Sequence, residues 1–166
     1  IKGDVQAHLG ALLAAEHELQ RACNRYGVDI VSAAMKKIQS YTDKMVRDSI
    51  RTIPNGVYEA EDYADTDGIT QNRVKVKVRL EIEDTSIKVD FTGTDPICQG
   101  AINSPKANTI SAALYSLQFF LAPDAPQNQG LFNPIEVILP EGCWLNATWP
   151  APTIGCTTLT AGKVTS

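Results

Sequence analysis

The side chains best suited to chemistry are few and widely spaced in this sequence of 166 residues. Asp90 stands at the end of a predicted strand beside an irregular loop, where a carboxylate can anchor a ligand or a hydrogen bond. An ion pair with a lysine across the strands is the commoner use of such a residue. Asn103 lies in that loop between glycine and proline residues, where asparagine usually bonds to its own backbone. Asp90 and Asn103 are therefore weak site candidates, and residue types alone do not identify the catalytic groups.

The remaining reactive residues argue against a metal site in this segment. His8 and His17 are the only 2 histidines, and they fall on opposite faces of a helix that turns about 100° per residue. The 4 cysteines contain no C-x-x-C pair and are expected to be reduced. The run from Asp65 to Gly68 resembles the start of a calcium loop, but Val74 stands where such a loop needs its glutamate. A plain turn is predicted there, and neither a metal nor a cofactor is expected in this segment.

The elements that must position these residues centre on a hairpin at about 73–92. Apolar and polar residues alternate through RVKVKVRLEIE, and again through IKVDF after a polar break, which is typical of two antiparallel strands with one buried face. The nearly all-apolar run at about 109–121 is too short to span a membrane and predicts a buried helix that covers this face. An α+β fold with an antiparallel sheet follows.

Before the sheet, residues 4–26 and 28–52 carry apolar side chains at helical spacing, with Gly27 between them. They predict a helical hairpin over residues 1–53, followed by the sheet, the buried helix and loops over 56–166. This is either a single α+β domain (1–166) or an internal fragment of a larger subunit. The sequence begins at Ile1 rather than at a methionine, which favours the fragment.

Composition limits the partners that the chain is expected to have. The net charge of -4 gives no electrostatic reason to bind nucleic acid. No apolar run approaches the roughly 20 residues of a membrane span, and the N-terminus lacks the pattern of a signal peptide. We therefore expect no membrane partner and a cytoplasmic location.

Several short segments carry a family likeness. They are IPNGVY at 53–58, VDFTGT at 89–94, GAINSP at 100–105, NQG at 128–130 and PEG at 140–142. In this order and spacing they resemble the B-type subunits of hydantoinases and the matching region of oxoprolinases, with the large subunits of acetone and acetophenone carboxylases as relatives. Cys143 and Trp144 depart from the Gly-Ser-like sequence usual in that family, which leaves the subfamily open.

The resemblance implies a role in the ATP-dependent hydrolysis of a small cyclic amide. It implies that an A-type subunit or domain, using ATP and Mg, phosphorylates the substrate, and that the B-type region hydrolyses the product. It also implies an oligomer and a divalent metal bound upstream of residue 1. Two alternatives remain: ketone carboxylation, as in the related carboxylases, and a scaffolding or subunit-contact module without chemistry of its own, which is favoured for the isolated segment.

Overall fold

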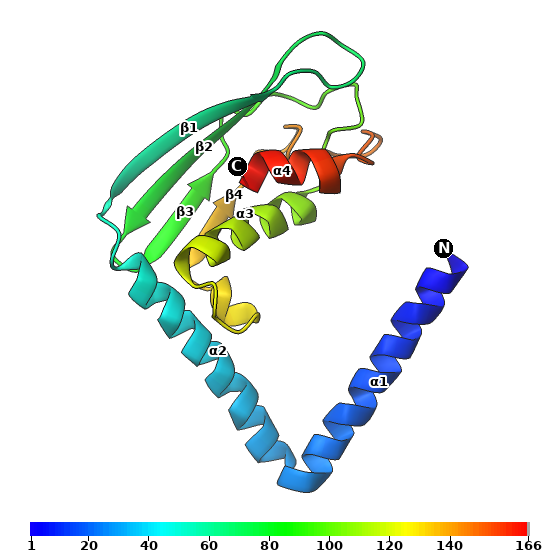
Figure 1. Ribbon diagram of the computed structural model, residues 1–166, viewed down its shortest axis with the longest axis vertical. Coiled ribbons are helices and arrows are strands. Elements are labelled where there is room, and N and C mark those ends of the chain that lie inside the picture. The colour runs from blue at the N-terminus through cyan, green and yellow to red at the C-terminus, as the bar shows by residue number, and fades with distance from the viewer. Residues whose placement is uncertain (166) are drawn as a thin grey trace. The chain divides into compact units, whose positions relative to one another are not determined.

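The computed structural model describes residues 1–165 of the chain, which form two compact units (Figure 1). The first unit is Ile1–Ser40, and the second begins at Tyr41. The boundary falls inside a helix, because Thr42, Val46 and Ile50 are buried in the second unit. None of the helices described is long and apolar enough to cross a membrane.

The first unit contains α1 (Lys2–Tyr26) and the start of α2 (Val28–Ile50), as the apolar spacing predicts. Gly27 separates them with a φ of 89°, in the region that favours glycine. Its amide donates to the carbonyl of Cys23 and closes the last turn of α1. α1 contains no buried residue, so the two predicted helices are present but do not form a packed hairpin.

The second unit is built on a four-stranded sheet in the order β1-β2-β3-β4. Its strands are β1 (Gly56–Ala64), β2 (Val74–Glu83), β3 (Ser86–Asp90) and β4 (Ile135–Ile138). The predicted central hairpin is confirmed, since β2 and β3 pair antiparallel with Leu80 opposite Val89. β4 pairs parallel with β3, so the expectation of a purely antiparallel sheet was wrong at this edge. The helix between β3 and β4 carries the chain back across the sheet, as a parallel connection requires.

That crossover helix is α3 (Lys106–Leu121), and it covers one face of the sheet, as predicted (Figure 1). Ala113 and Leu121 join the core with apolar residues of β2 and β3. The helix is not wholly buried, however. Tyr115, Phe119 and Phe120 are 61%, 72% and 77% exposed.

The segment after β4 closes the second unit, although its sequence predicts no regular element at its end. Trp144 and Leu145 are fully buried, and the indole nitrogen of Trp144 donates to the carbonyl of Lys75 at 2.8 Å. The chain then forms the short helical segment η2 (Cys156–Thr160), which leads into α4 (Ala161–Thr165). One further helical turn, η1 (Gln129–Leu131), precedes β4.

Candidate functional site

Asn103 is fully buried and organises the loop that leaves the sheet after β3. Its Oδ1 accepts from the amide of Cys98 at 3.0 Å. Its Nδ2 donates to the carbonyls of Cys98 and Gly100, both at 2.9 Å, and of Pro152 at 3.1 Å. The side chain therefore fixes residues 98–103 and ties them to the C-terminal segment.

Asp67, after β1, anchors the same loop from the other side and is 3% exposed. Its Oδ1 accepts from the amides of Ile69 and Thr70 at 2.9 and 2.6 Å, and its Oδ2 accepts from the amide of Gly100 at 2.9 Å. The hydrogen bonds from the Thr70 and Ile69 amides hold the pKa of Asp67 well below its ordinary value. The sequence does not reveal this anchor, because its partner Gly100 lies 33 residues further along the chain.

Gly100 itself has no room for a side chain. A Cβ at this position would lie 1.7 Å from the carbonyl oxygen of Asp67. The contact between the two loops therefore requires glycine here.

Asp90, the other candidate, caps the end of β3. Its Oδ1 accepts from the amide of Thr92 at 2.8 Å, and it stands opposite Arg79 in the sheet register. Partial burial acts to raise the pKa of Asp90, but the Thr92 hydrogen bonds and the charges of Lys88 and Arg79 outweigh it and lower that pKa. Among the described interactions, Asp90 and Asn103 share no hydrogen-bond partner.

The loop fixed by Asn103 also holds the C-terminal segment in place. The amide of Gly155 donates to the carbonyl of Ala101 at 2.9 Å, and the hydroxyl of Thr160 donates to the carbonyl of Ile102. The side-chain amide of Asn108 donates to the carbonyl of Cys156 at 3.1 Å. These contacts set the position of η2 and, through it, of α4.

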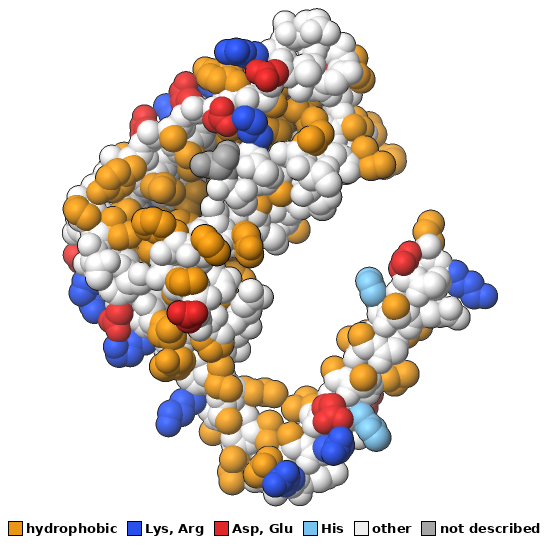
Figure 2. All heavy atoms as spheres, viewed as in Figure 1, with side chains coloured by type: hydrophobic (Ala, Val, Ile, Leu, Met, Phe, Trp, Pro, Cys, Tyr) orange, Lys and Arg blue, Asp and Glu red, His pale blue; other side chains and the backbone are white. Residues whose placement is uncertain are grey.

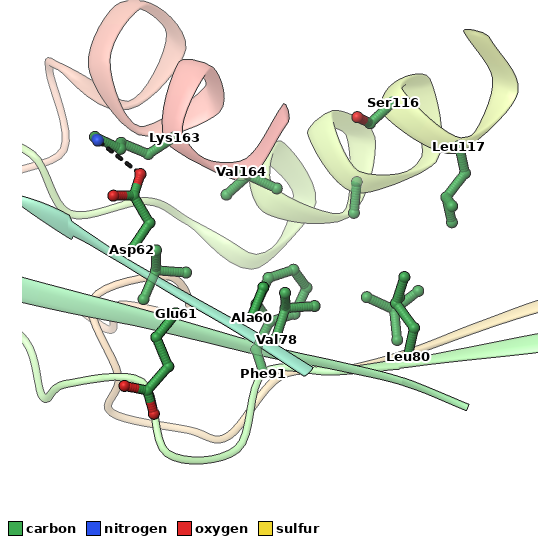
Figure 3. Close-up of a pocket in the computed structure, with 13 residues that line it drawn as sticks. Ala60, Glu61, Asp62, Val78, Leu80, Phe91, Ser116, Leu117, Lys163 and Val164 are labelled. Carbon is green, nitrogen blue, oxygen red and sulfur yellow. Dashed lines mark hydrogen bonds and ion pairs between the residues drawn. The ribbon is translucent and has the colours of Figure 1, made fainter. Parts of the chain in front are cut away.

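A cavity of about 410 Å³ lies between the inner face of the sheet and the helices α3 and α4 (Figure 3). Its walls are mostly apolar and include Val76, Val78, Leu80, Val89, Phe91, Ala113, Leu117 and Val164. At one end Lys163 on α4 donates from Nζ to Oδ2 of Asp62 on β1 at 2.7 Å. The carboxylate of Glu61 points away from the cavity (Figure 3).

The cavity can receive an apolar group, but it offers no evident reactive group. Asp62 and Lys163 neutralise each other, and the hydrogen bond from Lys163 lowers the pKa of Asp62. Asp90 and Asn103 are not among the residues that line it. Within residues 1–165, no group of three or more His, Cys, Asp or Glu side chains is arranged to hold a metal ion.

The thiols of Cys98 and Cys143 are poorly suited to nucleophilic chemistry. All four cysteines are free, as the sequence predicts. Burial raises the pKa of Cys98 and of Cys143, and the charge of Asp67 adds to the effect at Cys98. The Cys98 thiol lies 3.2 Å from Oδ1 of Asn103, so it serves as a hydrogen-bond donor in the loop.

Comparison with known proteins places this loop and sheet in a family. A family model described as hydantoinase B/oxoprolinase matches residues 1–166. The chain belongs to the hydantoinase B/oxoprolinase family. The putative B-type subunit of a D-/L-hydantoinase from Pseudomonas sp. (strain NS671) is 33% identical over an alignment of 165 positions that covers 93% of this chain and 28% of that protein. 5-Oxoprolinase 1 from Arabidopsis thaliana is 30% identical over an alignment of 176 positions that covers 98% of this chain and 14% of that protein.

Solved structures agree with the family assignment. The crystal structure of ATP-dependent caprolactamase from Pseudomonas jessenii has a TM-score of 0.87 at 30% identity, over 99% of this chain and 28% of that one. Acetone carboxylase in a nucleotide-free structure has a TM-score of 0.70 at 15% identity, over 84% of this chain and 20% of that one, and shows the shared fold alone. This hydantoinase B/oxoprolinase chain thus spans less than a third of each of these relatives.

The short segments that carry the family likeness in the sequence coincide with structural anchors. GAINSP contains Gly100 and Asn103, which organise the exit loop. NQG begins with Asn128, which accepts from the amide of Gly130 and donates to the hydroxyl of the buried Thr42. In the hydantoinase B/oxoprolinase chain these segments therefore hold loops in place.

Proposed function

We propose that this chain forms part of a B-type subunit that hydrolyses a small cyclic amide in an ATP-dependent reaction. The match of the hydantoinase B/oxoprolinase family model to residues 1–166 carries this proposal. The names of three relatives support it: a hydantoinase of the B type, a 5-oxoprolinase and an ATP-dependent caprolactamase. Hydantoin, 5-oxoproline and caprolactam share an amide within a ring.

Such an amide resists water because resonance makes its carbonyl carbon a poor electrophile. In the proposed reaction the amide oxygen attacks the γ-phosphorus of ATP on an A-type subunit or domain, with Mg, and ADP leaves. Water then adds to the activated carbon, the ring C–N bond breaks, and a second water releases phosphate from the acyl phosphate. The products are the ring-opened amino acid, ADP and phosphate, so two waters are consumed.

The residues of this chain do not fit the divalent metal that the family resemblance implies, because the described residues bring no set of three ligands together. We propose that such a metal binds to residues upstream of Ile1. The contribution proposed for this region is structural: Asp67, Gly100 and Asn103 hold the exit loop, and this loop holds α4 over the apolar cavity. We place the assembled, oligomeric enzyme in the cytoplasm.

The direct test is to measure ADP formation and ring opening together. A complete B-type subunit that carries residues 1–166, mixed with an A-type partner, is expected to open 5-oxoproline, hydantoin or caprolactam only when ATP is present. The 166-residue chain alone is expected to be inactive. Ring opening by the chain alone, without ATP, would contradict the proposal.

The rival function of ketone carboxylation gives a different result in the same assay. A carboxylase would incorporate labelled bicarbonate into a ketone with ATP and leave cyclic amides intact. The likeness to acetone carboxylase at 15% identity supports its fold but not that reaction. A scaffolding or subunit-contact role for residues 1–166 is compatible with the hydrolase proposal: the chain alone would be inactive, and activity would be lost when these residues are removed from the complete protein.

A further inference from the structure

The apolar cavity between the sheet and the helices α3 and α4 has the size and lining of a small-molecule site. Its volume of about 410 Å³ lies within the range of about 300–1,000 Å³ that such sites have. Small side chains on two of its walls, Ala60 of β1 and Ala113 of α3, leave this space open. On the face shown in Figure 2, apolar side chains gather between the sheet and α3. The cavity therefore favours a compact ligand with an apolar body.

The charged groups that face the cavity lie at one end of it. Lys163 and Asp62 form an ion pair there, and their side chains are 36% and 50% exposed to solvent. Val89 and Phe91, which also line the cavity, are buried. The carboxylate of Glu61 points away (Figure 3). The cavity thus offers an apolar wall to one part of a ligand and a partly hydrated ion pair to the other.

This ion pair suits a neutral polar group better than a charged one. Lys163 and Asp62 together carry no net charge, so a ligand carboxylate would be attracted to one and repelled by the other. The pair places an N–H donor beside a carboxylate acceptor, with 2.7 Å between Nζ and Oδ2. An amide within a small ring presents the complementary edge, because ring closure holds its N–H and C=O on the same side. Such an amide can accept from Lys163 and donate to Asp62 at the same time.

We propose that this cavity binds a neutral cyclic amide, with the ring carbons against the apolar wall and the amide at the ion pair of Lys163 and Asp62. This inference deepens the proposed function and rests on it. The amide stays at the partly exposed end of the cavity, where the proposed phosphorylation requires its oxygen to be accessible. The lining residues bind and orient the ring and carry out no chemical step.

Calorimetric titration of caprolactam into the complete B-type subunit tests this site. ATP and the A-type partner are left out, so that only binding is measured. Ala60→Phe fills the cavity from an exposed position on β1, and Lys163→Met removes the donor but keeps the apolar stem. The matched controls are Val57→Phe, on the other face of β1, and Arg73→Met, which removes the cation of the exposed pair between Arg73 and Asp65.

We expect the wild type and both controls to bind caprolactam equally well. Lys163→Met should weaken binding about tenfold or more, because a hydrogen bond to a charged group is lost. Ala60→Phe should weaken it about tenfold or more, because the added ring occupies the space of the ligand. 5-Oxoproline should bind at least about tenfold more weakly than caprolactam, since its carboxylate is repelled by Asp62.

Absence of caprolactam binding to the wild-type subunit would overturn the inference. So would binding that Ala60→Phe and Lys163→Met leave unchanged, even if the subunit opens the ring with ATP and its partner. 5-Oxoproline that binds as tightly as caprolactam would overturn the choice of a neutral ring. A subunit that binds caprolactam in this cavity but opens no ring with ATP and its partner would refute the proposed function and leave the binding site standing.

Discussion

At the scale of single residues, Asn103 is the clearest test of how the exit loop is held. Asn103→Ala leaves the carbonyls of Cys98, Gly100 and Pro152 without this donor. Each unsatisfied buried group costs about 1–3 kcal/mol, so we expect the free energy of unfolding to fall by about 3 kcal/mol or more. Urea unfolding measures the loss, and the exposed Asn133→Ala is the control that should change little. An unchanged unfolding midpoint for Asn103→Ala would contradict this role.

Substitution of Gly100 by alanine is expected to destabilise the protein, whereas the same substitution at Gly10 is expected to stabilise it. Gly100→Ala puts a Cβ 1.7 Å from the Asp67 carbonyl oxygen, so one of the two loops must move. We expect a loss of several kcal/mol, on the order of the large core effects. Gly10→Ala on α1 meets nothing within 4 Å and should instead stabilise the helix by about 0.5–1 kcal/mol. Thermal unfolding of the two variants distinguishes the effects, and similar shifts in both would refute the close approach.

Asp67 predicts a dependence on pH. Its folded pKa is lowered from the ordinary value of 3.8, so the unfolded chain binds the proton more tightly. The stability that Asp67 contributes is therefore fully present above that ordinary value and is lost as pH falls below it. Urea unfolding between pH 6 and pH 2 should show a shallower acid loss for Asp67→Asn than for the wild type. Equal slopes would mean that Asp67 is not held by these hydrogen bonds.

The sequence indicates the structural role of Asn103 but not that of Asp67. Asn103 stands out because it lies between glycine and proline in a loop, and the structure uses it as a loop anchor. Its role in a site stays a hypothesis, as does that of Asp90. Asp67 looks like an ordinary turn residue, because nothing nearby in the sequence indicates that Gly100 will donate to it.

At the scale of elements, the attachment of α4 depends on the hydroxyl that Thr160 donates to the carbonyl of Ile102. Thr160→Val keeps the size of the side chain but removes this donor. We expect amide exchange over residues 161–165 to accelerate while exchange in β2 and β3 stays unchanged, since the sheet does not rely on α4. Hydrogen exchange with mass spectrometry checks this, with the exposed Thr158→Val as control. Acceleration throughout the sheet would show that α4 is part of the core.

The central hairpin follows from the sequence because alternation in β2 and β3 records which face is buried. The direction of β4 does not follow. The four residues of β4 do not indicate whether this strand runs parallel or antiparallel to β3. The crossover through α3 determines the parallel pairing. For the same reason the sequence leaves η2 and α4 unassigned: their positions depend on bonds to Ala101 and Ile102, which are remote in sequence.

At the scale of the whole molecule, the chain leaves many large apolar side chains exposed to solvent. α3 is apolar on all sides, which predicts a buried helix, yet Phe119 and Phe120 are largely exposed. Leu9 and Leu12 on α1 are likewise 56% and 67% exposed. A sequence records which side chains avoid water but does not say which partner covers them, so burial could be predicted only where the partner lies within the described chain.

Removal of the first unit, residues 1–40, should therefore have little effect on the stability of the second unit. Every buried residue of the described chain lies at or after Thr42, so residues 1–40 contribute nothing to the core. A chain that begins at Tyr41 is expected to keep the free energy of unfolding within about 1 kcal/mol of the full chain. It should also be more soluble, because the exposed leucines of α1 are gone. Urea unfolding and near-ultraviolet circular dichroism measure the fold, and light scattering measures association. Loss of the near-ultraviolet signal would show that residues 1–40 are needed to fold the sheet.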